Sequence, residues 1–138
     1  MKRDYRNPEI AEKLLNQARL IAVVGLSDNP ARPSYDVASF LQRQGYKIVP
    51  VNPRIDSVLG EKSYPDLASI PGNIDVVDIF RKSEDIGPIV DEAISKGAGA
   101  IWMQLGIVNE QAADKAAEAG LDVVMDMCMK MEYNRIHG

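Results

Sequence analysis

The sequence has 138 residues, of which 46% are hydrophobic and 26% charged, and its net charge is −4 with an isoelectric point near 5.0. This length and composition predict a single soluble domain over residues 1–138. The acidic balance argues against nucleic acid as a partner, and no apolar run approaches the roughly 18 residues that span a membrane. With one cysteine and no secretory signal at the N-terminus, we expect a reducing, cytoplasmic setting.

Short apolar runs alternate with helical periodicity along the whole chain. Strands are expected over 20–24, 46–51, 74–80, 98–103 and 121–125, and helices over about 8–18, 34–45, 88–97, 109–120 and 126–133. The alternation predicts an α/β protein with a three-layer Rossmann-like fold, in which helices flank a five-stranded parallel sheet. We expect the strand order 3-2-1-4-5, with a ligand crevice beyond the C-terminal strand ends, between the first and fourth strands.

Some helix boundaries depend on single residues. Asn7 followed by Pro8 predicts the N-cap of the first helix. Pro88 would break a helix already under way, so the third helix is expected to begin there. Residues 66–70 are a candidate short helix. The methionines of 127–131 recur at a spacing of two, which favours a strand, but we expect a helix over this stretch.

The loop after the first strand, residues 25–34, has the composition of a phosphate-binding turn. Gly25 allows close backbone approach. Ser27 and Asn29 can donate hydrogen bonds to phosphate oxygens, and Ser34 can cap the next helix, whose free amides would then face an anion. An ordinary strand–helix connector is the alternative, and Asp36 in the first helical turn already offsets the helix dipole.

This loop does not match known nucleotide motifs. Positions 27 and 30 of a G-x-G-x-x-G pattern are Ser and Pro, and the Gly-Lys-Ser/Thr of a P-loop is missing. Enzymes that use NAD place an acid after the second strand, to bind the ribose hydroxyls, whereas this chain has Pro53 and Arg54 there. A cation at that point suits a ligand with a phosphate on its ribose, either NADP or coenzyme A.

Cations follow all three of the first predicted strands. Arg32 follows the first strand, Arg54 the second, and Arg81 with Lys82 the third. In an acidic protein this alignment indicates a local basic cluster for an anionic ligand, with scattered surface charge as the alternative.

Residues for catalysis are scarce. The single histidine, His137, is expected in a frayed tail, and no cluster has the spacing of metal ligands, so we expect no metal site. Asp78 and Asp126 are interpreted as structural. Cys128 is interpreted as a buried, inert thiol, or as one that meets the thiol end of coenzyme A.

Residues near the ends of the third and fourth strands are further candidates. Gln104 and Gly106 are expected to line the far end of the ligand site. Trp102 is expected to pack in the core, while Phe80 either flanks an adenine or packs.

Together these segments resemble the small stand-alone CoA-binding proteins, which are similar to the CoA-binding domain of the succinyl-CoA synthetase α subunit. The resemblance covers about residues 8–135 and rests on the order and spacing of the motifs at 23–34, 46–53, 79–81, 102–106 and 127–130. It implies that the 25–34 loop holds the CoA pyrophosphate and that Pro53 and Arg54 lie by the adenosine and its 3′-phosphate.

The resemblance also implies that Ile79, Phe80 and Arg81 border the adenine and ribose, and that Gln104 and Gly106 face the pantetheine arm. The phosphohistidine of the synthetase belongs to a second domain, which this chain does not contain, so its ligase reaction is not expected here. The sequence therefore predicts a non-catalytic module for CoA or an acyl-CoA. An NADP-dependent oxidoreductase and a regulatory subunit without a ligand are the alternatives, and a protein partner is left open.

Overall fold

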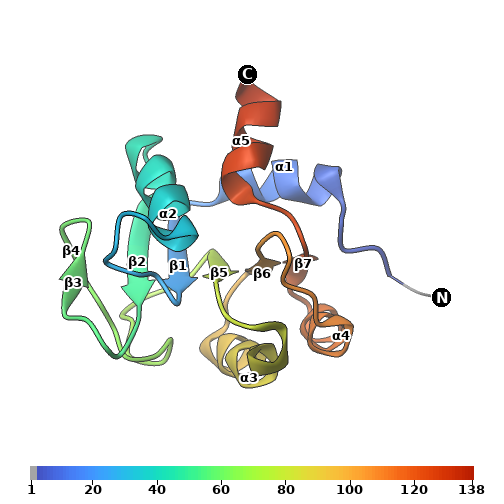
Figure 1. Cartoon of the computed structure of the whole chain (residues 1–138). Coiled ribbons are helices and arrows are strands. Elements are labelled where there is room, and N and C mark those ends of the chain that lie inside the picture. Colours follow the sequence, from blue (N-terminus) through green and yellow to red (C-terminus); the bar gives the residue numbers. More distant parts are fainter. Residues whose placement is uncertain (1–2) are drawn as a thin grey trace.

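The structure, a computed structural model, describes residues 3–138. Its helices and strands follow the expected alternation (Figure 1). In chain order they are α1 (Pro8–Gln17), β1 (Leu20–Val24), α2 (Pro33–Arg43), β2 (Lys47–Val51), β3 (Ser57–Val58), β4 (Glu61–Lys62), β5 (Val76–Ile79), the 3-10 helix η1 (Ser83–Asp85), α3 (Ile86–Lys96), β6 (Ala100–Met103), α4 (Glu110–Glu118), β7 (Asp122–Val124) and α5 (Met129–His137).

Five of these strands form one parallel sheet in the order β2-β1-β5-β6-β7. The α/β class and the parallel sheet are confirmed, but the expected order 3-2-1-4-5 is wrong, because the third long strand lies between the first and the fourth. Counted along the chain, the long strands follow the order 2-1-3-4-5. The direction of the connections therefore changes between β1 and β5, and the ligand crevice belongs there rather than between the first and fourth strands.

Two features of β2 explain why it lies at the sheet edge. Pro50 has no amide hydrogen to donate, so a strand that contains it suits an edge position better than a central one. The outer side of β2 is also covered. Tyr64 forms an isolated parallel bridge with Val51, and its backbone amide donates to the Pro50 carbonyl at 3.0 Å. The next long strand, β5, therefore pairs on the far side of β1.

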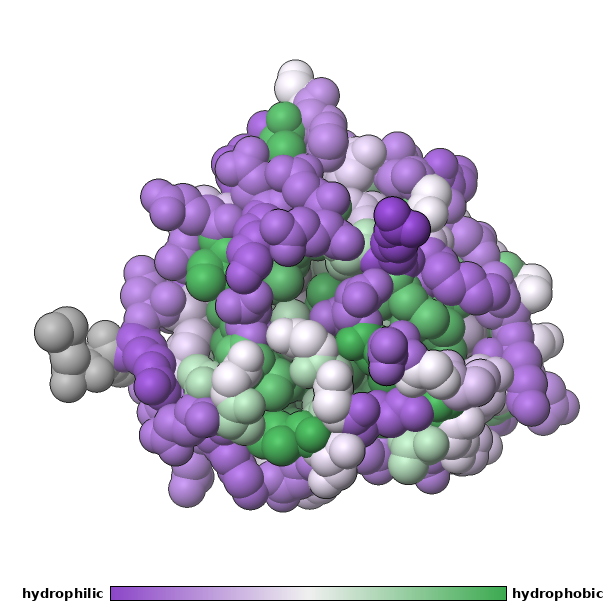
Figure 2. Space-filling view, turned by 180° about the vertical axis from the view of Figure 1, so that it is seen from behind, coloured by the Kyte–Doolittle hydropathy of each residue, from purple (hydrophilic) through white to green (hydrophobic). Residues whose placement is uncertain are grey.

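Helices cover both faces of the sheet (Figure 1). Helices α1, α2 and α5 pack over one face, and α3 and α4 pack over the other. Each layer encloses its own cluster of buried apolar side chains. Viewed from behind, the molecule has hydrophilic side chains around its margin and more hydrophobic ones toward the centre (Figure 2). No helix within residues 3–138 has the length and apolar character needed to cross a bilayer.

Several expected boundaries need correction. Helix α3 begins at Ile86, and Pro88 lies in its first turn, where a backbone amide is not required. Residues 66–70 form turns and bends instead of a helix, and the short antiparallel β3–β4 pair was not expected. Helix α5 includes His137, whose ring lies 4.2 Å from the Tyr133 ring, so this histidine is not in a frayed tail.

Candidate functional site

Two neighbouring cavities open at the carboxyl ends of the strands. The larger one, of about 760 Å³, extends from the loop after β1 toward α5, and the smaller one, of about 530 Å³, lies between β2 and the start of α3. Residues that line both cavities are Gly25, Asn52, Arg54 and Arg81. The two cavities therefore meet at the point where the sheet connections change direction.

Gly25 occupies the tightest point between them. It has a φ of +85°, and a Cβ atom here would lie 2.5 Å from the Phe80 carbonyl oxygen and 3.0 Å from the Cδ of Arg81. Its backbone amide donates to the Val51 carbonyl at 2.9 Å. The chain therefore turns off β1 directly against the end of β5, and only glycine has room for this passage.

The loop after Gly25 is held by its own polar side chains. The Ser34 hydroxyl accepts from the Ser27 amide, the Ser27 hydroxyl from the Asn29 amide, and the Asn29 carbonyl oxygen from the Ala31 amide, each at 3.0 Å. Ser34 does not cap α2, which corrects the expectation. The helix starts at Pro33 because proline at the first position already has a helical φ.

Only some of the predicted phosphate-binding residues line a cavity. Ser27 and the buried Ser34 line the larger cavity. Asn29 is exposed and lines neither cavity, and its side chain shapes the loop through its bond with the Ala31 amide. The carboxylate of Asp36, which was expected to offset the helix dipole, also forms an ion pair of 3.0 Å with Lys130 of α5.

The predicted cations do come together. Arg32 and Lys82 line the larger cavity, and Arg54 and Arg81 line both. None of these four side chains forms an ion pair with any residue in the range 3–138. Adjacent strands explain the convergence, because β2, β1 and β5 are neighbours and their ends lie at one edge. The result is a concentration of positive charge in an acidic protein, on side chains that have no ion-pair partner within residues 3–138.

The smaller cavity has a mixed lining. Pro53 lines it as expected, together with the acids Asp66, Glu84, Asp85 and Glu92. Two of these acids are already engaged: hydrogen bonds from the Ser69 hydroxyl and amide lower the pKa of Asp66, and Glu92 accepts from the Leu67 amide. The smaller cavity is therefore less positive than the larger one.

At the floor of the larger cavity, Gln104 is bonded to a buried acid. Gln104 Nε2 donates to Oδ1 of Asp78 at 2.5 Å, and Asp78 is fully buried, with no hydrogen-bond partner on Oδ2. Burial raises the pKa of Asp78 to about 7, although hydrogen bonds from Gln104 and from the Ile79 amide act in the opposite direction. The sequence shows an acid inside an apolar strand, but not the glutamine beside it.

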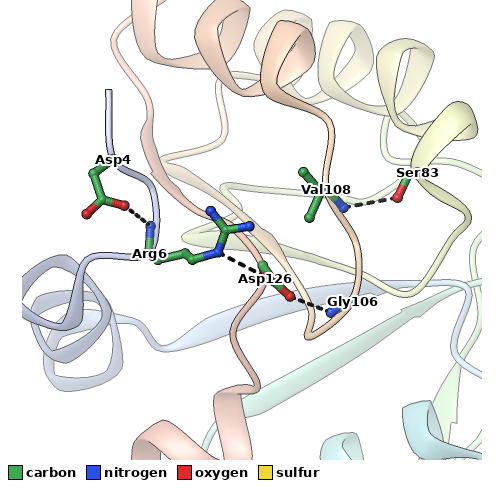
Figure 3. A network of polar contacts seen from close by, with 6 residues as sticks. All are labelled: Asp4, Arg6, Ser83, Gly106, Val108 and Asp126. Atoms are coloured by element: carbon green, nitrogen blue, oxygen red, sulfur yellow. Dashed lines mark hydrogen bonds and ion pairs between the residues drawn. The ribbon is translucent and has the colours of Figure 1, made fainter. Parts of the chain in front are cut away.

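The backbone amide of Gly106 helps to hold the loop between β6 and α4 in place. It donates to Asp126 Oδ1 at 2.7 Å, and Arg6 Nε donates to Asp126 Oδ2 at 2.9 Å (Figure 3). These hydrogen bonds lower the pKa of Asp126, which agrees with the structural role expected for it. On the other side of the loop, the Ser83 hydroxyl accepts from the Val108 amide at 3.0 Å (Figure 3). Gly106 lines neither cavity, so the expectation that it faces a ligand is not supported.

Of the remaining candidate residues, some are buried in the core and others line the larger cavity. Ile79 is fully buried in the core and lines neither cavity, while Phe80 lines the larger one. Trp102 is buried as expected, and its Nε1 donates to the Met127 carbonyl at 2.8 Å. Cys128 is only half-buried and lines the larger cavity, so the interpretation as a buried thiol needs correction.

Sequence reasoning missed the apolar mouth of the larger cavity. Leu105 and Met131 line it, and each is 60% exposed. A leucine after a strand and a methionine in a helix carry no sequence signal for such a position. The larger cavity thus has a cationic end near β2, β1 and β5 and an apolar end near β6 and α5. Within residues 3–138, no three His, Cys, Asp or Glu side chains are grouped to hold a metal ion.

A Rossmann-like sheet with a cationic crevice at its switch point defines a nucleotide-binding class of protein, and the comparison with known families is more specific. The chain belongs to the CoA-binding domain family, because residues 19–134 match the model described as "CoA binding domain". This confirms the family resemblance found in the sequence.

Three relatives show the range of this family. The chain is 43% identical over 130 residues to the uncharacterized protein YneT of Bacillus subtilis, covering 93% of this chain and 96% of that one. It shares 39% identity and a TM-score of 0.93 with the structure of a hypothetical protein from Pyrococcus horikoshii, covering 100% and 97%. It is also 30% identical to the ADP-forming acetate–CoA ligase II of Archaeoglobus fulgidus, covering 83% of this chain but 17% of the ligase.

The substitution Gly25→Ala tests the close passage between β1 and β5. Gly45→Ala is the matched control, because Gly45 also has a positive φ, of +103°, but a Cβ atom added there would have nothing within 4 Å. We expect the control to lose about 1–2 kcal/mol of unfolding free energy from backbone strain, and Gly25→Ala to lose roughly 1–3 kcal/mol more from the clash. Denaturant unfolding measures both, and equal losses would contradict a specific clash.

The substitution Asp78→Asn tests the burial of this acid. Its pKa of about 7 in the fold exceeds its ordinary value of 3.8, so the folded protein retains a proton that the unfolded chain loses. The free energy of unfolding should therefore fall as the pH rises from about 4 to about 7, and stay level above that. Asn has no proton to lose, so the variant should not show this dependence on pH. Thermal melts should show the variant gaining stability relative to wild type across this window; parallel pH courses would contradict the prediction.

Proposed function

We propose that this protein binds coenzyme A or an acyl-CoA across the two cavities and has no catalytic activity of its own. The observation that carries the proposal is a group of four cations that line the cavities with Gly25 and have no ion-pair partner in the described part of the chain, namely Arg32, Arg54, Arg81 and Lys82. Coenzyme A carries a pyrophosphate and a 3′-phosphate, so it matches such a concentration of charge. Membership of the CoA-binding domain family supports the same ligand.

The residues that line the two cavities indicate which part of the proposed ligand each cavity would hold. Arg54 lines both cavities and follows β2, where it would meet the 3′-phosphate, with Pro53 beside the adenosine in the smaller cavity. The pyrophosphate would then lie at the 25–34 loop. There the amides of Ser34 and Tyr35, in the first turn of α2, have no carbonyl four residues back within the helix.

The pantetheine arm would continue through the larger cavity, past Gln104. Its end would reach the apolar mouth formed by Leu105 and Met131, near Cys128. An acyl group bound there would cover apolar side chains that are otherwise exposed to water, and each Å² covered is worth about 25 cal/mol. This supports an acyl-CoA as a ligand alongside free CoA.

The absence of catalysis is part of the proposal. His137 lies at the end of α5 against Tyr133 and lines neither cavity. The ligase activity of the Archaeoglobus relative belongs to a protein of which this chain spans only 17%. An NADP-dependent oxidoreductase would use the same cations, so it is kept as an outcome of the binding test.

The substitution Arg54→Ala tests the ligand assignment. Calorimetry on the wild-type protein should show binding of CoA, weaker binding of dephospho-CoA, which lacks the 3′-phosphate, and little binding of NAD. We expect Arg54→Ala to lose about 1.5–3 kcal/mol of CoA binding energy, the value of a charged hydrogen bond, and to lose far less for dephospho-CoA.

Arg43→Ala is the control for this experiment. Arg43 is exposed, bonds Ser39 within α2 and lines neither cavity, so its loss should leave CoA binding unchanged. Equal wild-type affinity for CoA and dephospho-CoA would contradict the proposed contact between Arg54 and the 3′-phosphate. Binding of NADP without binding of CoA would favour the oxidoreductase.

A further inference from the structure

Behind Gln104, which lines the larger cavity, lies a buried carboxyl whose presence the binding proposal does not explain. Asp78 pairs in register with Val23 on β1 and with Trp102 on β6, and both neighbours are fully buried and apolar. A carboxyl in such surroundings is costly unless its polar atoms are satisfied. Its Oδ2 has no hydrogen-bond partner among residues 3–138, so the fold keeps this acid at a cost.

Register places Asp78 directly beneath the cavity. Side chains alternate along β5, so Asp78 and Phe80 point to the same face of the sheet. Gln104 lies beside Phe80 in the row beyond the strand ends, because Ile79 and Met103 are paired. Gln104 is 3% exposed, lines the larger cavity and bonds back to Asp78. Gln104 therefore connects the buried acid to the larger cavity.

The chemistry of the two side chains determines how the glutamine is turned. Above its pKa of about 7 the Asp78 carboxyl is ionised and can only accept hydrogen bonds, so the nitrogen of the Gln104 amide then faces it, as it does in the structure. The carbonyl oxygen, Oε1, then faces the other way. It receives no hydrogen bond from residues 3–138, and unlike Asp78 Oδ2 it is not among the buried, unpartnered atoms.

We infer that Asp78 is a positioning residue, which turns the Gln104 carbonyl oxygen toward the larger cavity and so selects a ligand that offers a hydrogen-bond donor at that point. Without Asp78 the glutamine amide could present either its NH₂ group or its oxygen. The inference rests on the proposed function, in which the pantetheine arm passes Gln104. The amide N–H groups of that arm are donors of the required kind.

Two ligands separate this inference from the proposed function. Coenzyme A contains the pantetheine arm, whereas adenosine 3′,5′-bisphosphate has the nucleotide and 3′-phosphate without it. We expect Asp78→Leu to weaken CoA binding about three- to tenfold at pH 8, the range of one neutral hydrogen bond, and to leave the binding of the bisphosphate unchanged. If wild-type protein binds neither ligand, the proposed function itself fails.

A double-mutant cycle shows whether Asp78 acts through Gln104. In a Gln104→Ala background, Asp78→Leu should cause no further loss of CoA affinity, because the positioned group is already gone. Val76→Ala is the control for general damage, since Val76 is fully buried on the same face of the same strand and should leave CoA affinity unchanged. Additive losses, equal losses for both ligands, or full CoA affinity in Asp78→Leu would each overturn the inference.

A measurement on wild-type protein keeps the test independent of how well Asp78→Leu folds. The side-chain amide signals of Gln104 in a ¹H–¹⁵N spectrum can be assigned by their loss in Gln104→Ala. Addition of CoA should shift them, and addition of adenosine 3′,5′-bisphosphate should not. Signals that respond equally to both ligands, or to neither, would contradict a contact between Gln104 and the pantetheine arm.

Discussion

The close approach of β1 and β5 at Gly25 is the constraint on which the site depends. A Cβ atom at this residue would lie 2.5 Å from the Phe80 carbonyl oxygen, so the two strand ends are too close together for a side chain here. This contact forms because β5 pairs with β1, and it brings the loop after β1 against Arg81. The two cavities meet at Gly25, and the direction of the chain after this residue shapes both of them.

The charges around this passage are opposite in sign to the net charge of the protein. The chain has a net charge of −4, yet four cations gather near the ends of β2, β1 and β5 and form no ion pair within the described residues 3–138. Like charges in one region destabilise a fold, and the proposed binding of an anionic ligand would offset that cost. The hydrogen bonds within the 25–34 loop hold its shape without a ligand.

The larger cavity changes character from one end to the other. Its cationic end suits phosphates, its floor has a glutamine bonded to a buried acid, and its mouth is apolar. The proposed ligand would match this change of character by combining anionic, polar and apolar parts in that order. Coenzyme A with an acyl group has this sequence of parts, whereas a dinucleotide has phosphates at its centre and polar groups at both ends.

The sequence by itself determined the alternation of strands and helices, the family, and the cations that follow the first three strands, because periodicity and residue type are local properties. It also contained a signal that was missed, since Pro50 marks β2 as an edge strand. Only the tertiary structure decided the order 2-1-3-4-5, the bond between Asp78 and Gln104, and the positions of Asn29, Ile79 and Gly106 outside the linings of the two cavities. These depend on which strands become neighbours and on which way each side chain points, and such contacts join residues far apart in the chain.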